Sequence, residues 1–143
     1  MFLYYLAKKY FPHLGERPVT ERDVRRVAKR VGVEIVEGDV GVPGMYLPYG
    51  WAFFIVIHPG LTGVMRLWVL MHELSHHLLH DTGMQLFDSR FRTKADHQAN
   101  FISALSLLPL LTIQTKTFAE LLEEGYPREL LWRRKEIYEQ FKI

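Results

Sequence analysis

Hydrophobic and polar positions along the first part of the chain predict two helices. Residues 2–11 are rich in aromatic and aliphatic side chains and are followed by proline and glycine, which favour the end of a short helix. Thr20 precedes an acidic first turn and is therefore expected to be an N-cap. Valine and alanine then recur at helical spacing, so a second helix is predicted over residues 20–31, with Gly32 ending it.

The following segments have the pattern of strands. Residues 33–36 alternate between apolar and polar side chains, and residues 45–47 form a second candidate. Residues 51–58 give the strongest pattern, because they are continuous, aromatic and β-branched between Gly50 and Pro59. We therefore expect a small, mostly antiparallel sheet of about three strands.

The rest of the chain returns to helical spacing. Residues 62–80 are predicted to form a helix whose buried stripe contains Leu67, Leu70, Leu74 and Leu78. Pro109 interrupts the later pattern, and further helices are expected over residues 93–107, 117–124 and 127–141. Helices, a small sheet and then helices again indicate an α+β fold, and the lack of repeats or linkers favours one domain over residues 1–143.

The composition is that of a globular protein with little excess charge. Of 143 residues, 48% are hydrophobic and 24% are charged, and the formal net charge is +2. The basic residues of the predicted helix 20–31 are best explained as a solvated surface, so we expect no direct binding of nucleic acid. No segment has the ~18 uncharged apolar residues of a membrane span, and the N-terminal residues lack the charge order of a secretory signal. We therefore expect a cytoplasmic protein without membrane contact.

The absence of cysteine restricts the possible chemistry. Disulfides, thiolate zinc sites and a cysteine nucleophile are all excluded. A transition metal would therefore have to bind imidazole nitrogens and carboxylate oxygens.

One predicted helix contains the pattern His-Glu-x-x-His, at residues 72–76. Side chains four residues apart lie on the same helix face, so His72 and His76 can bind one ion. Glu73 lies about 100° round the helix, close enough to hold a water molecule on that ion. Zinc suits these donors, so we predict a zinc site with Glu73 as general base.

Two further histidines follow on the same helix. His77 points away from the face of the motif histidines and is expected in solvent or in packing contacts. His80 lies on nearly the same face as the motif histidines, but a turn further on, where it could support a ligand or line the cleft. A histidine favoured by the dipole at the helix C-terminus is the simpler interpretation of His80.

A catalytic zinc site needs a third protein ligand. The candidates are His58, Asp81, Asp88, Asp96 and His97. Asp96 and Asn100 are four residues apart on a predicted helix, so the acid can bind the ion while Asn100 accepts a hydrogen bond from a ligand imidazole. His97, about 100° round the same helix, remains the rival third ligand. His58, at a strand end, is expected to be a loop or cleft-edge residue.

Two segments carry a resemblance to a known family. They are His-Glu-Leu-Ser-His-His-Leu-Leu-His and, further along, Lys-Ala-Asp-His-Gln-Ala-Asn-Phe-Ile-Ser-Ala-Leu-Ser-Leu-Leu-Pro. With their surroundings, over about residues 51–110, they resemble the ImmA/IrrE metallopeptidases. That family pairs a His-Glu-Leu-Gly-His helix with a later Glu-x-x-Ala-Asn and a Leu-Leu-x-Pro segment.

The resemblance implies a zincin-like metallopeptidase domain, with an active-site helix and C-terminal helices. It implies zinc ligands at His72, His76 and Asp96 and a catalytic glutamate at Glu73. Members of this family cleave helix-turn-helix repressors in the cytoplasm, so such a repressor is the expected substrate and partner. The chain departs from the family pattern at Ser75 for glycine, Ser103 for alanine and Asp96 for glutamate.

These observations support two functions that differ in chemistry. The first is a zinc-dependent endopeptidase in which Glu73 takes a proton from the attacking water, with strand 51–58 binding extended substrate as an edge strand. The second is a metal-containing binding module that grasps a repressor or antitoxin without cleaving it. The sequence does not indicate an oligomeric state.

Overall fold

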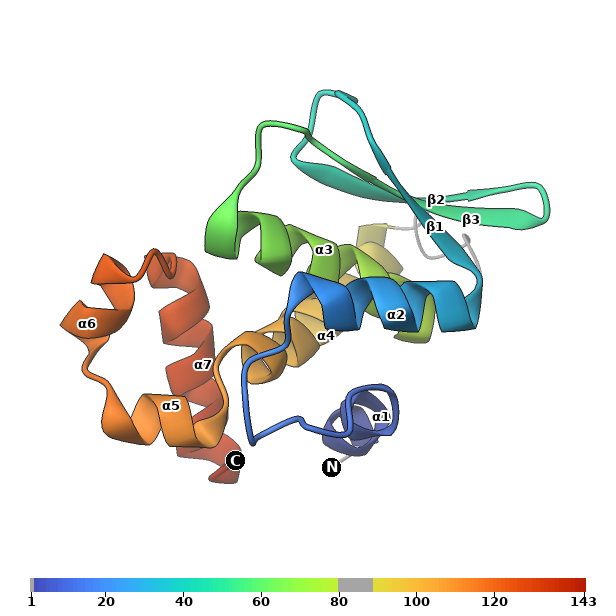
Figure 1. Ribbon diagram of the computed structural model, residues 1–143. Coiled ribbons are helices and arrows are strands. Elements are labelled where there is room, and N and C mark those ends of the chain that lie inside the picture. The colour runs from blue at the N-terminus through green and yellow to red at the C-terminus, as the bar shows by residue number, and fades with distance from the viewer. Residues whose placement is uncertain (1, 80–88) are drawn as a thin grey trace.

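Seven helices and one three-stranded sheet make up the computed structural model, which describes residues 2–79 and 89–143 (Figure 1). In chain order the elements are α1 (Phe2–Tyr10), α2 (Glu21–Val31), β1 (Val33–Glu37), β2 (Gly44–Tyr49), β3 (Ala52–Ile57), α3 (Gly63–Leu79), α4 (Ser89–Leu107), α5 (Leu110–Thr115), α6 (Phe118–Glu123) and α7 (Arg128–Phe141). The α+β class expected from the sequence is confirmed.

Helix α2 begins and ends where its sequence predicts. The Thr20 hydroxyl accepts a hydrogen bond from the Asp23 N–H at 3.2 Å, and the Asp23 carboxylate accepts one from the Thr20 N–H at 2.9 Å. This reciprocal capping box satisfies donors that the start of a helix otherwise leaves without partners. At the other end Gly32 adopts a left-handed conformation with φ 80°, which closes the helix.

The sheet is mixed, whereas the sequence pattern predicts mostly antiparallel strands. Its strand order is β1-β3-β2, with β3 parallel to β1 and antiparallel to β2. A two-residue turn with Gly50 at φ 61° joins β2 to β3, which explains their antiparallel pairing. β1 runs parallel to β3 and pairs with the side of β3 that is opposite β2. Because no turn joins β1 directly to β3, no local sequence pattern specifies that the two strands are parallel.

Strand β3 occupies the centre of the sheet. Its continuous apolar sequence fits this place, since Ile55 and Ile57 are fully buried. The expectation that strand 51–58 binds substrate as an edge strand is therefore wrong. The two edge strands are β1 and β2, and Pro48 in β2 is compatible with an edge because it has no N–H to donate.

The sheet covers one side of the helical layer and packs on α3 (Figure 1). Helix α4 packs against α3, and α1 and α7 pack in turn on α4. The core holds fully buried apolar side chains, among them Ile55, Leu70, Met71, Leu74 and Ile102. Helix α3 is therefore held between the sheet and α4, which fixes the direction of each of its faces.

Helix α5 has no counterpart in the sequence pattern. Pro109 ends α4 as expected, but it also precedes α5 directly with φ −58°, a backbone angle that suits the start of a new helix. Six residues are too few for helical periodicity to appear in the sequence. Within the described parts of the chain, no helix is long and apolar enough to cross a membrane.

Replacing Asp23 with asparagine is expected to destabilise the fold by about 2 kcal/mol at neutral pH. Asp23 is 5% exposed and accepts hydrogen bonds from Arg17, Arg26 and Thr20. The bonds from Arg17 and Thr20, with that from Arg17 foremost, hold the pKa of Asp23 well below its usual range, although burial opposes them. A carboxylate with a lowered pKa stabilises the folded state above its unfolded pKa, and this contribution is lost as the pH falls through the folded pKa.

Urea denaturation at neutral and acidic pH measures this effect. The difference in free energy of unfolding between wild type and Asp23→Asn should shrink as the pH falls below about 4. Glu139→Gln, at a side chain that is 61% exposed, is the control and should change stability little at either pH. A difference for Asp23→Asn that stays constant with pH would contradict the assigned role of its charge.

Candidate metal centre

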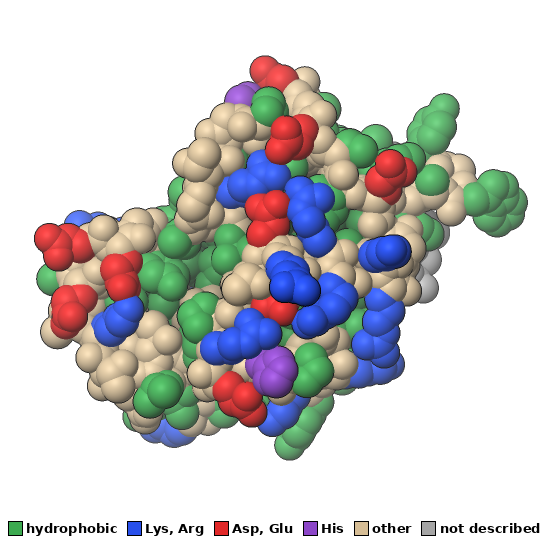
Figure 2. Space-filling model, in the orientation of Figure 1, with side chains coloured by type: hydrophobic (Ala, Val, Ile, Leu, Met, Phe, Trp, Pro, Cys, Tyr) green, Lys and Arg blue, Asp and Glu red, His purple; other side chains and the backbone are tan. Residues whose placement is uncertain are grey.

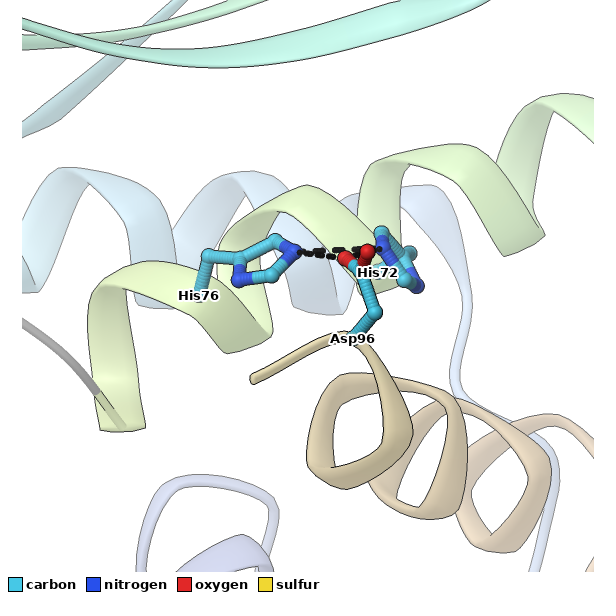
Figure 3. Close-up of side chains that lie close together, drawn as sticks. All are labelled: His72, His76 and Asp96. Atoms are coloured by element: carbon cyan, nitrogen blue, oxygen red, sulfur yellow. Dashed lines mark hydrogen bonds and ion pairs between the residues drawn. The ribbon is translucent and has the colours of Figure 1, made fainter. Parts of the chain in front are cut away.

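His72 and His76 lie on one face of α3, and Asp96 extends toward them from α4 (Figure 3). The spacing of four residues places the two imidazoles one helical turn apart. His76 is buried, whereas His72 and Asp96 are partly exposed. One donor atom from each residue lies within 4.8 Å of the other two. The fold thus brings together two residues of the motif and an acid from a separate helix.

The distances fit a single metal ion. Asp96 Oδ1 lies 3.2 Å from His72 Nε2 and 2.9 Å from His76 Nε2, and the two Nε2 atoms are 3.2 Å apart. Ligands held at about 2.0–2.2 Å around a tetrahedral zinc lie about 3.3 Å from one another, so only a small outward movement is needed. Two imidazoles and one carboxylate leave a fourth position open, as catalytic zinc sites require.

Asn100 holds the ring of His72 in place. Its Oδ1 lies 2.8 Å from His72 Nδ1. An amide oxygen can only accept a hydrogen bond, so Nδ1 carries the proton and Nε2 presents its lone pair toward Asp96. This is the contact that the spacing of Asp96 and Asn100 predicts.

The short side chain of Asp96 reaches the histidines because α3 and α4 pack closely. Both helices carry small buried residues, which permit a close approach and are at most 1% exposed: Ser75 on α3 and Ala95, Ala99 and Ser103 on α4. The hydroxyls of Ser75 and Ser103 donate to the carbonyl four residues earlier in their own helices, at 2.7 and 2.8 Å. The two serines that depart from the family pattern are therefore satisfied without a partner across the interface.

The rival histidines lie elsewhere. His97 is on another face of α4 and lines a hollow of about 330 Å³ with side chains from α1 and α7. His58 accepts a hydrogen bond from the Gly60 N–H at 2.9 Å, in the loop after β3. Within the described parts of the chain, Asp96 is the one acid grouped with the two motif histidines. Outside the described residues lie His80, Asp81 and Asp88.

His77 links α3 to the edge strand beside the site. Its Nδ1 lies 2.6 Å from the Tyr46 hydroxyl, and its ring contacts that of Phe53 with centroids 4.8 Å apart. The sequence predicts solvent or packing for His77, and the structure shows packing. Tyr46 is 31 residues away, so no spacing within the helix could have identified it as the partner.

Glu73 lies against β2, which packs on α3. The Tyr46 backbone N–H donates to the Glu73 carboxylate, and a Cβ added at Gly44 would lie 3.5 Å from Glu73 Cγ. Burial raises the pKa of Glu73 to about 6; the charge of Asp96 adds to the rise, and the nearby imidazole and the Tyr46 N–H oppose it. A carboxylate with this pKa can accept and return a proton near neutral pH.

A family model described as the IrrE N-terminal-like domain, of peptidase family M78, matches residues 28–142. This range contains the three strands and the helices that carry His72, His76 and Asp96. The resemblance found in the sequence is therefore confirmed at the level of the family. Comparison with curated proteins and with solved structures gives no match.

Removing Asp96 should weaken metal binding far more than removing His97. Asp96→Ala deletes one of three donors, so we expect a loss of zinc affinity beyond the ~10- to 100-fold that removal of a supporting residue causes. His97→Ala should leave zinc affinity unchanged, because His97 faces a different hollow. Chelator competition and elemental analysis measure both variants. Equal losses in the two variants would refute Asp96 as the third ligand.

Replacing Gly44 with alanine should push β2 away from α3. The added Cβ would overlap the Val69 side chain. Such overpacking is expected to lower the free energy of unfolding by about 1–3 kcal/mol. Gly38→Ala is the matched control, because its Cβ would meet only Val56 Cγ1 at 3.4 Å. Thermal unfolding compares the two variants. A midpoint for Gly44→Ala that is no lower than that of Gly38→Ala would contradict the close contact.

Proposed function

Because the chain belongs to the IrrE N-terminal-like peptidase family, we propose that it is a zinc-dependent endopeptidase with Glu73 as its general base. The observation that carries this proposal is the convergence of His72, His76 and Asp96. Glu73 lies on α3, the helix that also carries the two histidines. The donor set of two imidazoles and one carboxylate, with one open position, favours zinc in a catalytic rather than a structural site.

The residues around the site have separate tasks in hydrolysis. A bound zinc ion would polarise a water molecule and the scissile carbonyl. Glu73 accepts the proton that the water loses as its oxygen attacks the carbonyl carbon. When the C–N bond breaks, Glu73 returns this proton to the leaving amine. Asn100 keeps the His72 ring oriented throughout, because it holds the Nδ1 proton.

Of the two edge strands, β1 and β2, the one beside the site is β2, and we assign the binding of an extended substrate to it. It borders Glu73 through Gly44 and Tyr46, whereas β3 is paired on both sides. A substrate that lies along β2 is extended, which is the form that peptidases cleave. Its scissile bond would then lie near the beginning of β2, beside Glu73.

For the substrate we propose a helix-turn-helix repressor in the cytoplasm. Support comes from the resemblance to the ImmA/IrrE metallopeptidases, whose members act on such proteins. The formal net charge of +2 is a small excess for 143 residues, which fits recognition of a protein rather than of nucleic acid.

A second candidate is a binding module that holds the repressor, or an antitoxin, without cleaving it. The apolar side chains exposed on β2 favour it, because they are suited to holding a partner. Both candidates use the same metal centre, so only a search for cleavage distinguishes them.

Glu73→Gln should retain zinc and lose cleavage. Glutamine cannot accept the proton, so the rate is expected to fall about 100- to 10,000-fold, while the three ligands remain. Zinc-loaded wild type and variant are incubated with a peptide library prepared from a cell extract, and mass spectrometry counts new termini. The same assay with a helix-turn-helix repressor encoded near the protein's own gene tests the substrate.

Each result of this assay has one meaning. Loss of zinc along with activity would show that Glu73 has been misassigned. Cleavage of peptides but not of the repressor would refute the proposed substrate alone. A stable complex with intact repressor, with no peptide cleaved by the wild type, would support the binding module.

A further inference from the structure

The strand beside the candidate metal centre carries a row of exposed apolar side chains. Met45, Leu47 and Tyr49, here called the outer row, are 36%, 39% and 74% exposed, and Trp51 in the following turn is 101% exposed. Hydrophobic side chains project from the body at this end of the sheet (Figure 2). Successive large apolar side chains left in water on one strand and its turn mark a binding surface.

The outer row follows from the alternation of side chains along β2. One set of alternate residues faces the helices: Tyr46 is 4% exposed and contacts His77, and Gly44 lies against Glu73. The other set therefore faces away from the helices, on the side of the sheet where Leu47 pairs with Phe54. The row begins one residue after Gly44 and ends at the β2–β3 turn.

The main chain of β2 offers an arriving strand few hydrogen bonds. Tyr46 directs its N–H toward Glu73, so Gly44 and Pro48, which alternate with it, also turn their main-chain groups toward the outer edge. The Tyr46 N–H is already used by the carboxylate, and Pro48 has no N–H. A bound segment must therefore gain much of its affinity from side chains, and the outer row lies where they would be.

We infer that the outer row selects the segment presented to the metal centre: an extended stretch of protein with a large apolar side chain at every second position. The inference rests on the proposed function, since it concerns the substrate of the same site. A segment lying along β2 directs alternate side chains to opposite faces of the sheet. One set contacts the outer row, and the other points toward α3, on the side of Glu73. Trp51 extends the apolar contact beyond the end of β2.

Charge and backbone chemistry favour a protein segment over other occupants. Residues 44–52 contain no lysine or arginine, which surface-binding segments use to reach anionic lipids. Edge-to-edge pairing of two copies needs a continuous ladder, which Pro48 interrupts. A protein segment that pairs over a few residues and is held by its side chains needs neither basic residues nor a continuous ladder.

The test measures binding and is independent of cleavage. Zinc-loaded Glu73→Gln protein is titrated with two fluorescent peptides of equal length and composition. One peptide alternates apolar and polar residues, and the other groups its apolar residues together. The glutamine oxygen can still accept the Tyr46 N–H, so β2 keeps its place. By fluorescence anisotropy, we expect the alternating peptide to bind at least about tenfold more tightly.

Two further variants, each made in the Glu73→Gln protein, locate the preference. Leu47→Asp places a charge in the middle of the outer row and should reduce the preference to about twofold or less. Leu111→Asp is the control, because Leu111 is 58% exposed on α5, outside the outer row, and should leave the preference intact. Both variants should keep the zinc content and the unfolding midpoint of their parent.

Equal affinity for the two peptides, or a preference that survives Leu47→Asp, would overturn the inference. So would vesicle binding or self-association that Leu47→Asp abolishes while the two peptides bind alike. A further outcome is a binding preference that depends on Leu47 while the wild type cleaves neither the peptide library nor the repressor. That combination would support the inference about the outer row and refute the proposed endopeptidase activity.

Discussion

The candidate metal centre requires donor atoms from two helices to meet at one point, and much of the fold serves that requirement. His72 and His76 are placed by the spacing of a single helix, but Asp96 has a short side chain on a second helix. Helices α3 and α4 must therefore approach closely, and small buried residues on both allow it. Helices α1 and α7 pack on α4 and support it from the other sides.

The contact between β2 and α3 is the second constraint. Gly44 lets the strand come close, and the Tyr46 hydroxyl joins it to His77 on the helix. Glu73 is enclosed between the two elements, and its burial raises its pKa to about 6. The same alternation that turns Tyr46 inward exposes the outer row, so one strand serves both proton transfer and the proposed recognition of the substrate.

Local chemistry is sufficient to predict several of the helix ends. Thr20 and Gly32 form the caps that their residue types favour, and Pro109 ends α4. The helix that follows Pro109 is too short to produce a period, and the direction of β1 depends on a strand with which it shares no turn. The apolar run of residues 51–58 predicts a strand correctly, but its central place depends on neighbours on both sides.

The sequence by itself determined the motif at residues 72–76, because a helix fixes the relative positions of residues four apart. It also determined the choice of metal donors, because the chain has no thiol. Helix spacing left Asp96 and His97 as rivals, and only the packing of α4 on α3 directed Asp96 toward the histidines and His97 toward a separate hollow. Tertiary structure likewise made β2 an edge strand and β3 the central one. Such contacts join segments far apart in the chain, and their geometry depends on packing that no local pattern encodes.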